Sequence, residues 1–518
     1  MKDLLPEEKR TPNGNGVVIK VDPKRVKGKI DPNVFGLHLE HIWNCVYPCV
    51  WVGAGSDIDN TDGIRNDTLE LLSALRPTVF KYPGGYFTDF YDWRDGTGPR
   101  EKRPAREYPC VPGRVESNAF GTAEFMTLCR LVGAEPYLSV NTTSIQASDA
   151  AHWVEYCNGT RATYWANRRR ADGYDEPFGV RYWAIGNEPY WLHTPEAYAE
   201  RFRLWAHWMS NVDPSIRLVA GGLEPGQEFY RSCNVDGTWG ERFIRESRGL
   251  SWLRSGWHAT VEENQVFYSI HPYFNATADC TREGYYAALE ELLTRLPGAI
   301  AAVGAQFDEV LENAPRPKLV FDEYGMIHQC RMDGNMTQPT PFWDALWLGV
   351  FFHICFEHAD EIGIVTHPGP INMEHALLLL EEGQVVATPS YHLFKIYRDH
   401  GGGEVLETEV YGAPAFGKEK IDGVRVCASK RRESKEILIS VVNLDLDRTL
   451  ATEIQFAGKG VRKASAQELF AEDIHAANSV QSPNAVVPAG VSVELRDGRL
   501  ACRLLPHSVT VFRIETEI

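Results

Sequence analysis

The sequence contains no hydrophobic run long enough to span a membrane, and no apolar segment of the signal-peptide type follows its first residues. Its 11 cysteines are scattered, without a C-x-x-C pair or a cysteine–histidine group at zinc-finger spacing. Unpaired cysteines of this kind are typical of reduced thiols. We therefore predict a cytoplasmic protein that has no membrane contact and no metal site.

Several common catalytic signatures are missing as well. No G-x-G-x-x-G opens a helix after an early strand, which argues against a dinucleotide site. Neither H-E-x-x-H nor G-x-S-x-G occurs, which disfavours a zinc protease and an α/β-hydrolase. The net charge of −17 argues against nucleic acid as a main partner. We predict no cofactor.

What the chain does contain is a long alternation of strand-like and helix-like segments. Its 518 residues, 43% hydrophobic and 24% charged, suffice for a large core and a second domain. Strands alternating with amphipathic helices predict a parallel sheet, and eight repeats favour a (β/α)8 TIM barrel over an open doubly wound sheet. The predicted strands are 33–40, 78–83, 135–141, 180–187, 216–222, 266–271, 318–322 and 362–366. The predicted helices are 65–75, 122–132, 147–157, 195–212, 285–313 (broken at Pro297) and 342–357.

The last quarter of the chain has a different texture. Short strands are separated by turn signals and show little helical period, which predicts an antiparallel β-sandwich. We therefore predict an α/β fold in four parts. Residues 1–16 form a flexible tail, 17–32 a strand that packs with the sandwich, 33–390 the catalytic barrel, and 391–518 the β-sandwich domain.

Two glutamates follow short apolar runs at predicted strand ends. Glu188 stands in Gly-Asn-Glu-Pro after the run 180–185, and Glu323 stands in Asp-Glu-Tyr-Gly after the run 318–321. Chemistry in parallel barrels takes place at the carboxyl ends of the strands, and two neighbouring carboxylates suit glycoside hydrolysis. For any single glutamate a surface or salt-bridged position is the better interpretation. The pairing of two strand-end glutamates brings the catalytic interpretation level with it.

The surroundings of the two glutamates suggest different roles. Trp183 and Trp191 flank Glu188, and an apolar setting raises a carboxyl pKa and keeps the group protonated as a general acid. Glu323 has a tyrosine hydroxyl beside it and Lys81 at another strand end, which favour an ionised nucleophile. We therefore predict that Glu188 is the general acid/base and that Glu323 is the nucleophile.

A third stretch, residues 81–87, consists of Lys-Tyr-Pro-Gly-Gly-Tyr-Phe. Paired glycines after a strand let the backbone approach a ligand closely, so Lys81 and Tyr86 are candidate substrate contacts. Trp93, further along, is a candidate for stacking on a sugar. A plain strand-to-helix turn explains the same residues equally well.

Short motifs follow one another along nearly the whole chain, at 40–41, 51–53, 60–67, 82–85, 95–101, 153–158, 186–188, 322–323 and 505–512. In this order they resemble glycoside hydrolase family 51. The resemblance implies a (β/α)8 barrel with a β-sandwich and a retaining mechanism. The family is known chiefly for α-L-arabinofuranosidases, and it also contains endo-β-glucanases and xylan-active members.

The resemblance also implies roles for single positions. Glu188 matches the family's general acid/base and Glu323 its nucleophile. Asn187 matches the residue that binds the sugar 2-hydroxyl, Glu40 matches a glutamate that binds sugar hydroxyls, and Tyr273 matches the tyrosine near the nucleophile. Relatives are often homo-oligomers, so the resemblance implies a homo-oligomer as well.

Several positions depart from the family pattern. The family usually has arginine where this chain has Lys81, and a small or amide residue where it has Tyr86. Arginine is a planar fork and lysine a point charge, so this change alters geometry as well as strength. Tyr324 and Gly325 replace Trp-Asn, and the family's usual glutamine falls at about Gly363. We expect an intact catalytic pair above a rebuilt sugar pocket.

We predict an exo-acting, retaining α-L-arabinofuranosidase for arabinose-containing plant oligosaccharides and polysaccharides, with catalytic carboxyl oxygens about 5–5.5 Å apart. One alternative is an endo-β-1,4-glucanase or xylanase with an open cleft. Another is a carbohydrate-binding protein that has lost catalysis through the changes at Lys81 and Tyr86. The predicted substrate-binding residues are Glu40, Lys81, Tyr86, Trp93, Asn187 and Tyr273.

Overall fold

The computed structural model describes residues 16–108, 113–226, 235–250, 266–276, 281–312, 314–328, 340–373, 375–431, 436–458 and 460–516. The predicted tail of residues 1–16 lies outside this part of the chain, apart from Gly16.

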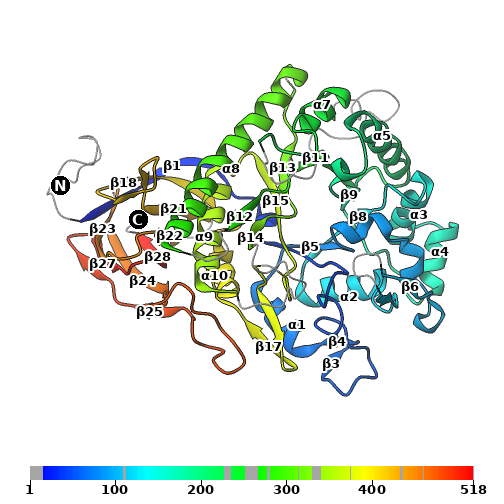
Figure 1. The fold of residues 1–518 in the computed structure, drawn as a ribbon, viewed down its shortest axis with the longest axis horizontal. Coiled ribbons are helices and arrows are strands. Elements are labelled where there is room, and N and C mark those ends of the chain that lie inside the picture. Colours follow the sequence, from blue (N-terminus) through cyan, green and yellow to red (C-terminus); the bar gives the residue numbers. More distant parts are fainter. Residues whose placement is uncertain are drawn as a thin grey trace.

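Eight parallel strands close into a barrel, which confirms the predicted fold class (Figure 1). Each strand is a short apolar run, because a parallel barrel strand is covered on both faces. Seven of the eight lie within the predicted strand segments, and the strand that starts at Ile362 continues two residues past its predicted end at 366. In barrel order they are β10 (Arg217–Gly221), β11 (Val266–Ser269), β13 (Lys318–Phe321), β15 (Ile362–Pro368), β2 (Gly36–His38), β5 (Val79–Tyr82), β8 (Glu135–Val140) and β9 (Tyr182–Ile185).

The barrel interior is a packed core. Alternate residues of seven strands point inward and form one buried cluster, as expected where side chains fill a barrel in layers. The cluster consists of Val79, Tyr137, Tyr182, Ala184, Val219, Phe267, Val320 and Ile364.

Helices surround the barrel, and the predicted ones are present with shifts of a few residues. The expected break at Pro297 is wrong, because α8 (Arg282–Leu311) continues through that residue. A proline removes one backbone donor, and the buried face of α8 continues on both sides of it, with Leu292 before and Ile300 after. The other helices are α1 (Asn66–Leu75), α2 (Thr122–Val132), α3 (Ala147–Asn158), α4 (Tyr164–Ala171), α5 (Pro195–Val212), α7 (Trp239–Glu246), α9 (Phe342–Glu357) and α10 (Pro389–Tyr397).

The C-terminal strands form a mixed, mostly antiparallel sheet that folds over its own core as a β-sandwich. Strands β24 and β27 are far apart in the sheet order and still contact each other. Buried residues such as Ile19, Ile439 and Phe512 fill the space between the layers. In sheet order the strands are β25 (Ala489–Val491), β24 (Val461–Leu469), β28 (Ser508–Thr516), β22 (Glu436–Asn443), β21 (Val424–Lys430), β18 (Glu404–Tyr411), β1 (Val17–Lys29), β23 (Leu450–Phe456), β27 (Arg499–Leu504) and β26 (Glu494–Arg496).

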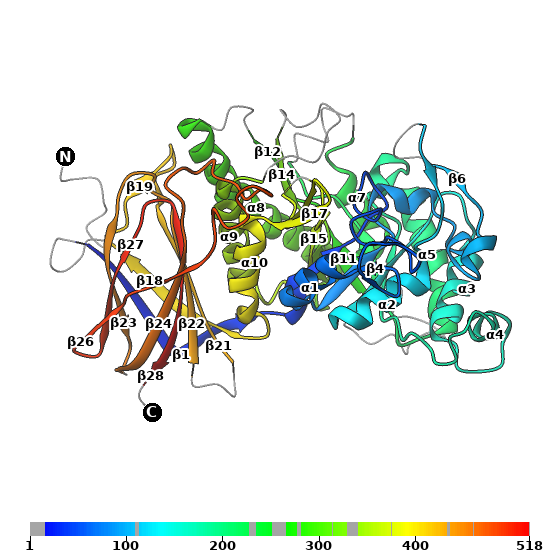
Figure 2. The same ribbon diagram turned by 90° about the horizontal axis from the view of Figure 1, so that it is seen from below.

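The first described strand lies in this sheet. β1 pairs antiparallel with β18 and parallel with β23. Helices α9 and α10 contact sandwich strands, and Figure 2 shows them between the sandwich and the barrel. Because α10 runs across positions 390 and 391, the sequence boundary drawn there stays a prediction.

Several two-stranded sheets lie in the connecting segments outside the barrel and the sandwich. One of them, β12 (Tyr273–Ala276) with β14 (Gly325–His328), extends the chain beyond β11 and β13. The others are β3 (Asn60–Thr61) with β4 (Ile64–Arg65), β6 (Arg106–Glu107) with β7 (Val115–Glu116), β16 (Leu378–Glu381) with β17 (Gln384–Ala387), and β19 (Ala415–Phe416) with β20 (Ile421–Asp422).

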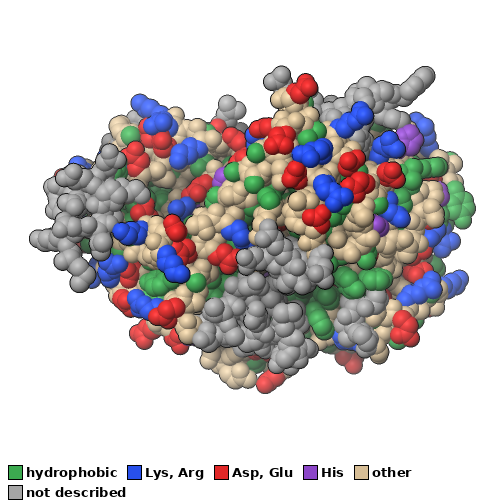
Figure 3. Space-filling model, turned by 45° about the horizontal axis from the view of Figure 1, so that its top comes forward, with side chains coloured by type: hydrophobic (Ala, Val, Ile, Leu, Met, Phe, Trp, Pro, Cys, Tyr) green, Lys and Arg blue, Asp and Glu red, His purple; other side chains and the backbone are tan. Residues whose placement is uncertain are grey.

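Among the described helices, none combines the length and the apolar character that crossing a bilayer requires. On the face drawn in Figure 3, acidic and basic side chains are interspersed across the described surface.

The tight barrel wall at β2 predicts a packing cost for Gly36→Ala. A Cβ there would lie 2.5 Å from Val79 Cγ1 and 2.9 Å from the Val365 carbonyl oxygen. Overpacking of this kind costs about 1–3 kcal/mol, so we expect a melting temperature several degrees below that of the wild type. Gly55→Ala is the matched control, because a Cβ at Gly55 meets nothing within 4 Å. Equal melting temperatures for the two variants would contradict the packing argument.

Candidate active site

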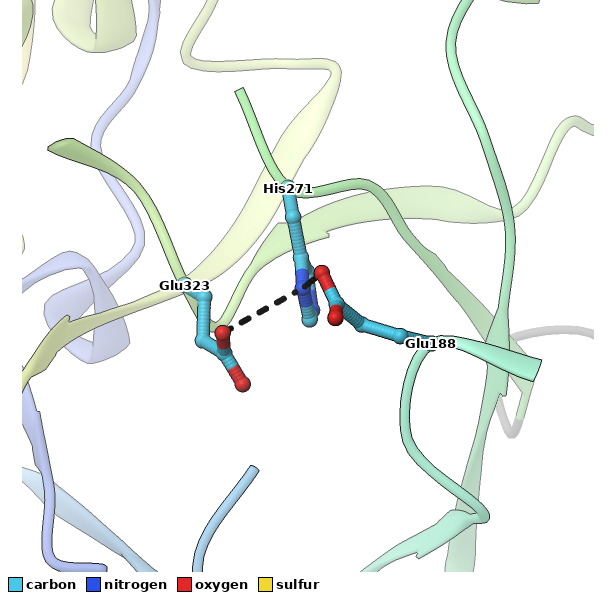
Figure 4. Close-up of side chains that lie close together, drawn as sticks. All are labelled: Glu188, His271 and Glu323. Carbon is cyan, nitrogen blue, oxygen red and sulfur yellow. Dashed lines mark hydrogen bonds and ion pairs between the residues drawn. The ribbon is translucent and has the colours of Figure 1, made fainter. Parts of the chain in front are cut away.

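Glu188 and Glu323 come together at the carboxyl ends of two barrel strands. Glu188 follows β9, Glu323 follows β13, and His271 follows β11. Figure 4 shows the His271 ring lying between the two carboxylates. One ligand atom from each of the three side chains can be chosen so that all lie within 4.8 Å of one another. The two glutamates are therefore close enough to act on one bond.

Glu188 is held by three donors. Its Oε1 accepts from the Tyr190 hydroxyl at 2.6 Å and lies 2.9 Å from His271 Nδ1. Its Oε2 accepts from the Trp191 indole at 2.8 Å. The backbone at Glu188 has a φ of 43°, in the left-handed region, just before the 3-10 turn η6 (Pro189–Trp191). Strained backbone of this kind is concentrated at functional sites.

Glu323 has a different set of neighbours. Its Oε2 accepts from the Tyr273 hydroxyl at 3.1 Å and lies 3.5 Å from His271 Nδ1. Its Oε1 is buried and has no hydrogen-bond partner within the described residues. The expected hydroxyl of Tyr324 is not the donor, because it lies 2.9 Å from His367 Nδ1 instead.

Asp322, the residue before Glu323, contacts both Lys81 and His271. Its Oδ2 lies 2.9 Å from Lys81 Nζ, and its Oδ1 lies 3.0 Å from His271 Nε2. These cations hold the pKa of Asp322 well below its usual range, although burial alone would raise it. The predicted pairing of Lys81 with Glu323 is present as the longer contact, with 3.9 Å between Nζ and Oε1. The closer partners of Lys81 are Asp322 and Asn187, and Lys81 donates to Asn187 Oδ1 at 3.0 Å.

Glu40, two residues after β2, approaches Gly85 together with Glu323. Its Oε1 accepts from the backbone N–H of Phe87 at 3.0 Å. The paired glycines make this crowding possible, since a Cβ at Gly84 would lie 2.4 Å from Glu40 Cγ and one at Gly85 would lie 2.2 Å from Glu323 Oε1. Burial and the charge of Glu323 raise the pKa of Glu40 to about 7.

The pKa directions predicted for Glu188 and Glu323 are wrong for the resting protein. Burial tends to raise the pKa of Glu188, but the hydrogen bond and charge of His271, with Tyr190 and Trp191, lower it to about 2. Trp191 acts as a donor rather than as an apolar wall. For Glu323 the balance is reversed, because burial raises its pKa further than the cation His271 lowers it.

Trp93 is not available to a sugar. It is 1% exposed, stacks against Trp153 with 5.9 Å between ring centroids, and donates its indole N–H to the Asp149 carbonyl. The stacking contact predicted for Trp93 is therefore wrong, and its aromatic surface belongs to the core. Tyr86, by contrast, is 54% exposed and packs edge-on against Phe90.

Two of the residues that depart from the family pattern, Tyr324 and Gly363, lie outside the floor of the pocket. Tyr324 is 1% exposed and stacks on Phe351 of α9 at 4.0 Å, so it points into the barrel wall. Gly363 is the second residue of β15, at the amino end of the barrel near Lys318. The prediction that the family's usual glutamine falls at about Gly363 is therefore wrong, because this position lies at the opposite end of the barrel from the site.

His271 is the residue of this site that was not predicted from the sequence. Its position directly after a buried strand is the same signal that singled out Glu188 and Glu323. Its donor atoms and those of the two glutamates also form the group, among the described residues, that most resembles a metal-binding site. These atoms already pair with one another, and the absence of a metal site stays a prediction.

Comparison with known proteins decides the family. A family model described as alpha-L-arabinofuranosidase 1 domain matches residues 71–234, and one described as alpha-L-arabinofuranosidase C-terminal domain matches residues 322–508. The chain is 31% identical to alpha-L-arabinofuranosidase C of Emericella nidulans over 383 residues, 73% of each chain. The chain belongs to glycoside hydrolase family 51, the α-L-arabinofuranosidases. It is therefore a glycoside hydrolase.

Family 51 relatives match this chain over almost its full length. An intracellular exo-alpha-L-arabinofuranosidase of Bacteroides ovatus is 27% identical and covers 96% of this chain and 95% of its own. The crystal structure of the family 51 arabinofuranosidase of Xanthomonas axonopodis pv. citri superposes with a TM-score of 0.85 at 27% identity, covering 96% of this chain and 99% of that one.

The buried contact between Lys81 and Asp322 predicts a large cost for Lys81→Met. Removing one partner leaves an uncompensated buried charge, which costs about 3–5 kcal/mol. Chemical unfolding should show this loss. The double variant Lys81→Met/Asp322→Asn should lose less than the two single variants combined. A Lys81→Met protein as stable as the wild type would contradict the assigned ion pair.

Proposed function

We propose that this family 51 protein is a retaining, exo-acting α-L-arabinofuranosidase for arabinose-containing plant oligosaccharides and polysaccharides. One observation carries the mechanism: carboxylate oxygens of Glu188 and Glu323 lie within 4.8 Å of each other. Retaining glycosidases hold their carboxyl groups about 5–5.5 Å apart, whereas inverting enzymes need about 6.5–9.5 Å to admit a water molecule. The short separation favours direct attack by one carboxylate.

In the proposed mechanism Glu323 is the nucleophile and Glu188 the acid/base. Glu323 attacks the anomeric carbon while Glu188 gives a proton to the leaving oxygen, which leaves a glycosyl ester on Glu323. Glu188 then removes a proton from water, and the water oxygen displaces Glu323 from the sugar. The Tyr273 hydroxyl holds Glu323 Oε2, so Oε1, which lacks such a partner, is the oxygen that attacks.

The sugar is proposed to lie among Glu40, Asn187 and the catalytic pair. Lys81 fixes Asn187 by donating to its side-chain oxygen, which turns the amide N–H groups toward other partners. Lys81 itself is fully buried, so its contribution to substrate binding passes through Asn187 and Asp322. Exposed Tyr86 is placed at the rim, where it would meet the part of the substrate beyond the first sugar.

Exo action is supported by burial of the catalytic pair. The side chains of Glu188 and Glu323 are 17% and 11% exposed, which suits a pocket for one terminal sugar better than an open cleft. We also propose a cytoplasmic location, which the free cysteines and the named intracellular relative support. We also propose a homo-oligomer, which the sequence resemblance to family 51 implies.

Release of nitrophenol from an aryl α-L-arabinofuranoside tests the function. We expect turnover by the wild type and a loss of at least about 10³-fold in Glu323→Ala, because no covalent intermediate forms without the nucleophile. Glu135→Ala is the matched control, since Glu135 lies at the amino end of β8 with its side chain 47% exposed. It should retain wild-type turnover.

Two outcomes would contradict this assignment. Equal activity in wild type and Glu323→Ala would exclude Glu323 as nucleophile. A wild-type protein that leaves the arabinofuranoside intact but shortens β-1,4-glucan or xylan chains internally would replace the exo-arabinofuranosidase by an endo-acting enzyme. Binding of oligosaccharides without any turnover would favour the carbohydrate-binding alternative.

A further inference from the structure

The His271 imidazole has a carboxylate oxygen at each of its two ring nitrogens. Nδ1 lies 2.9 Å from Glu188 Oε1, and Nε2 lies 3.0 Å from Asp322 Oδ1. A neutral imidazole carries one N–H, so it can donate to only one of the two oxygens. Asp322 is ionised, so the Nε2–H of the imidazole donates to it. A second proton is then needed between Nδ1 and Glu188 Oε1, because two lone pairs would otherwise face each other at 2.9 Å.

This contact accommodates two protonation states with the same number of protons. In one state His271 is an imidazolium that donates to both carboxylates, and Glu188 is ionised. In the other His271 is neutral and donates from Nε2 to Asp322, while protonated Glu188 donates to Nδ1. The first state is a resting form, and the second is the form in which Glu188 can act as a general acid.

We propose that His271 is a positioning residue that stores the catalytic proton and passes it to Glu188 along the Nδ1–Oε1 hydrogen bond during glycosylation. The inference rests on the proposed function and deepens it. It explains how Glu188 can protonate a leaving group although Tyr190 and Trp191 also donate to it and favour its ionised form. Glu188 therefore becomes protonated during the reaction instead of beforehand.

The proton balance closes over one catalytic cycle. The proton leaves His271 Nδ1 for Glu188 Oε1, and Glu188 transfers it to the glycosidic oxygen as the bond to the anomeric carbon breaks. His271 is then neutral and Glu188 ionised. In the second half, Glu188 takes a proton from the attacking water and returns it to Nδ1. Each turnover consumes one water and leaves His271 as it began.

Bond formation at Glu323 drives the transfer in the required direction. Glu323 Oε2 lies 3.5 Å from His271 Nδ1, so the ionised nucleophile stabilises the imidazolium. When Glu323 becomes an ester its negative charge disappears, and the imidazolium loses that support. The proton then favours Glu188 at the stage when the leaving oxygen needs it.

The surrounding charges keep one proton at this position across the neutral range. Burial opposes a cation at His271, whereas the charge of Glu323 and the hydrogen bonds to Asp322 and Glu188 favour one. The balance raises the pKa of His271 well above its ordinary value. The titratable and charged groups that face the pair are His38 and Glu40 from the β2 end, Lys81 from β5, Asp89 after β5, Tyr137 from β8, Tyr190 after β9, Tyr273 from β12, and Asp322 and Glu323 after β13.

The test compares His271→Gln with wild type on two arabinofuranosides, one with a dinitrophenyl leaving group and one with an alkyl leaving group. Only the alkyl group needs protonation. We expect kcat/KM for the alkyl substrate to fall at least about tenfold more than for the dinitrophenyl substrate. We also expect the alkaline limb of its pH profile to move about one pH unit lower, because Glu188 must then hold the proton alone.

His38→Gln is the matched control. His38 is 1% exposed and also contacts Asp322, but through the main-chain carbonyl, with Nδ1 3.1 Å from that oxygen. Its replacement should leave the alkaline limb in place. An equal loss on both substrates with an unchanged pH profile in His271→Gln would overturn the proposal. Absence of activity in the wild type would instead overturn the proposed function, so the two failures are distinguishable.

A second measurement needs no variant, in case His271→Gln does not fold. In protein labelled with ¹⁵N-histidine at pH 8, histidines of ordinary pKa are neutral. One imidazolium signal should persist and become neutral at the pH where kcat/KM for the alkyl substrate declines. Lack of such a signal, or a signal whose titration does not follow the rate, would contradict proton storage on His271.

Discussion

Neutralisation of one buried carboxylate, Asp322, organises the whole site. An isolated ion at such a depth costs several kcal/mol, so the fold must supply donors around it. They come from three other barrel strands, and this requires those strands to end at the same level. The two cations among them also contact Glu188 or Glu323, so the charge balance around Asp322 also affects the protonation of these two glutamates. The donors are Lys81 from β5, Tyr137 from β8, and Ser269 and His271 from β11 and its end.

The lysine at position 81 has a structural explanation in this network. A compact ammonium group with three donors reaches both Asp322 and Asn187 from within the barrel wall. The glycines that follow leave room for Glu40 and Glu323 to approach the same stretch of backbone. Lys81 therefore has a clear structural role in this chain, and the Glu188 and Glu323 carboxylates lie within 4.8 Å of each other above it.

The barrel and the meeting of Glu188 and Glu323 were predictable from the sequence because both leave local signals. A strand covered on both faces is a continuous apolar run, and a glutamate before a glycine or proline marks its end. The protonation of the two glutamates left no such signal. The pKa of Glu188 depends on a contact with His271, 83 positions away, and on the direction of the Trp191 indole N–H. Trp93 was misassigned because an aromatic residue type does not reveal whether its ring faces a sugar or the core.

The central claim is that Glu323 forms a covalent bond to the sugar while Glu188 supplies and removes the proton. It is tested most directly by incubating Glu188→Ala with dinitrophenyl α-L-arabinofuranoside, then identifying the modified peptide by mass spectrometry. This leaving group departs without an acid, whereas the water step lacks its base, so the ester should accumulate. The account predicts one arabinosyl group on Glu323. A label on another residue, or rapid release of sugar with no labelled peptide, would contradict it.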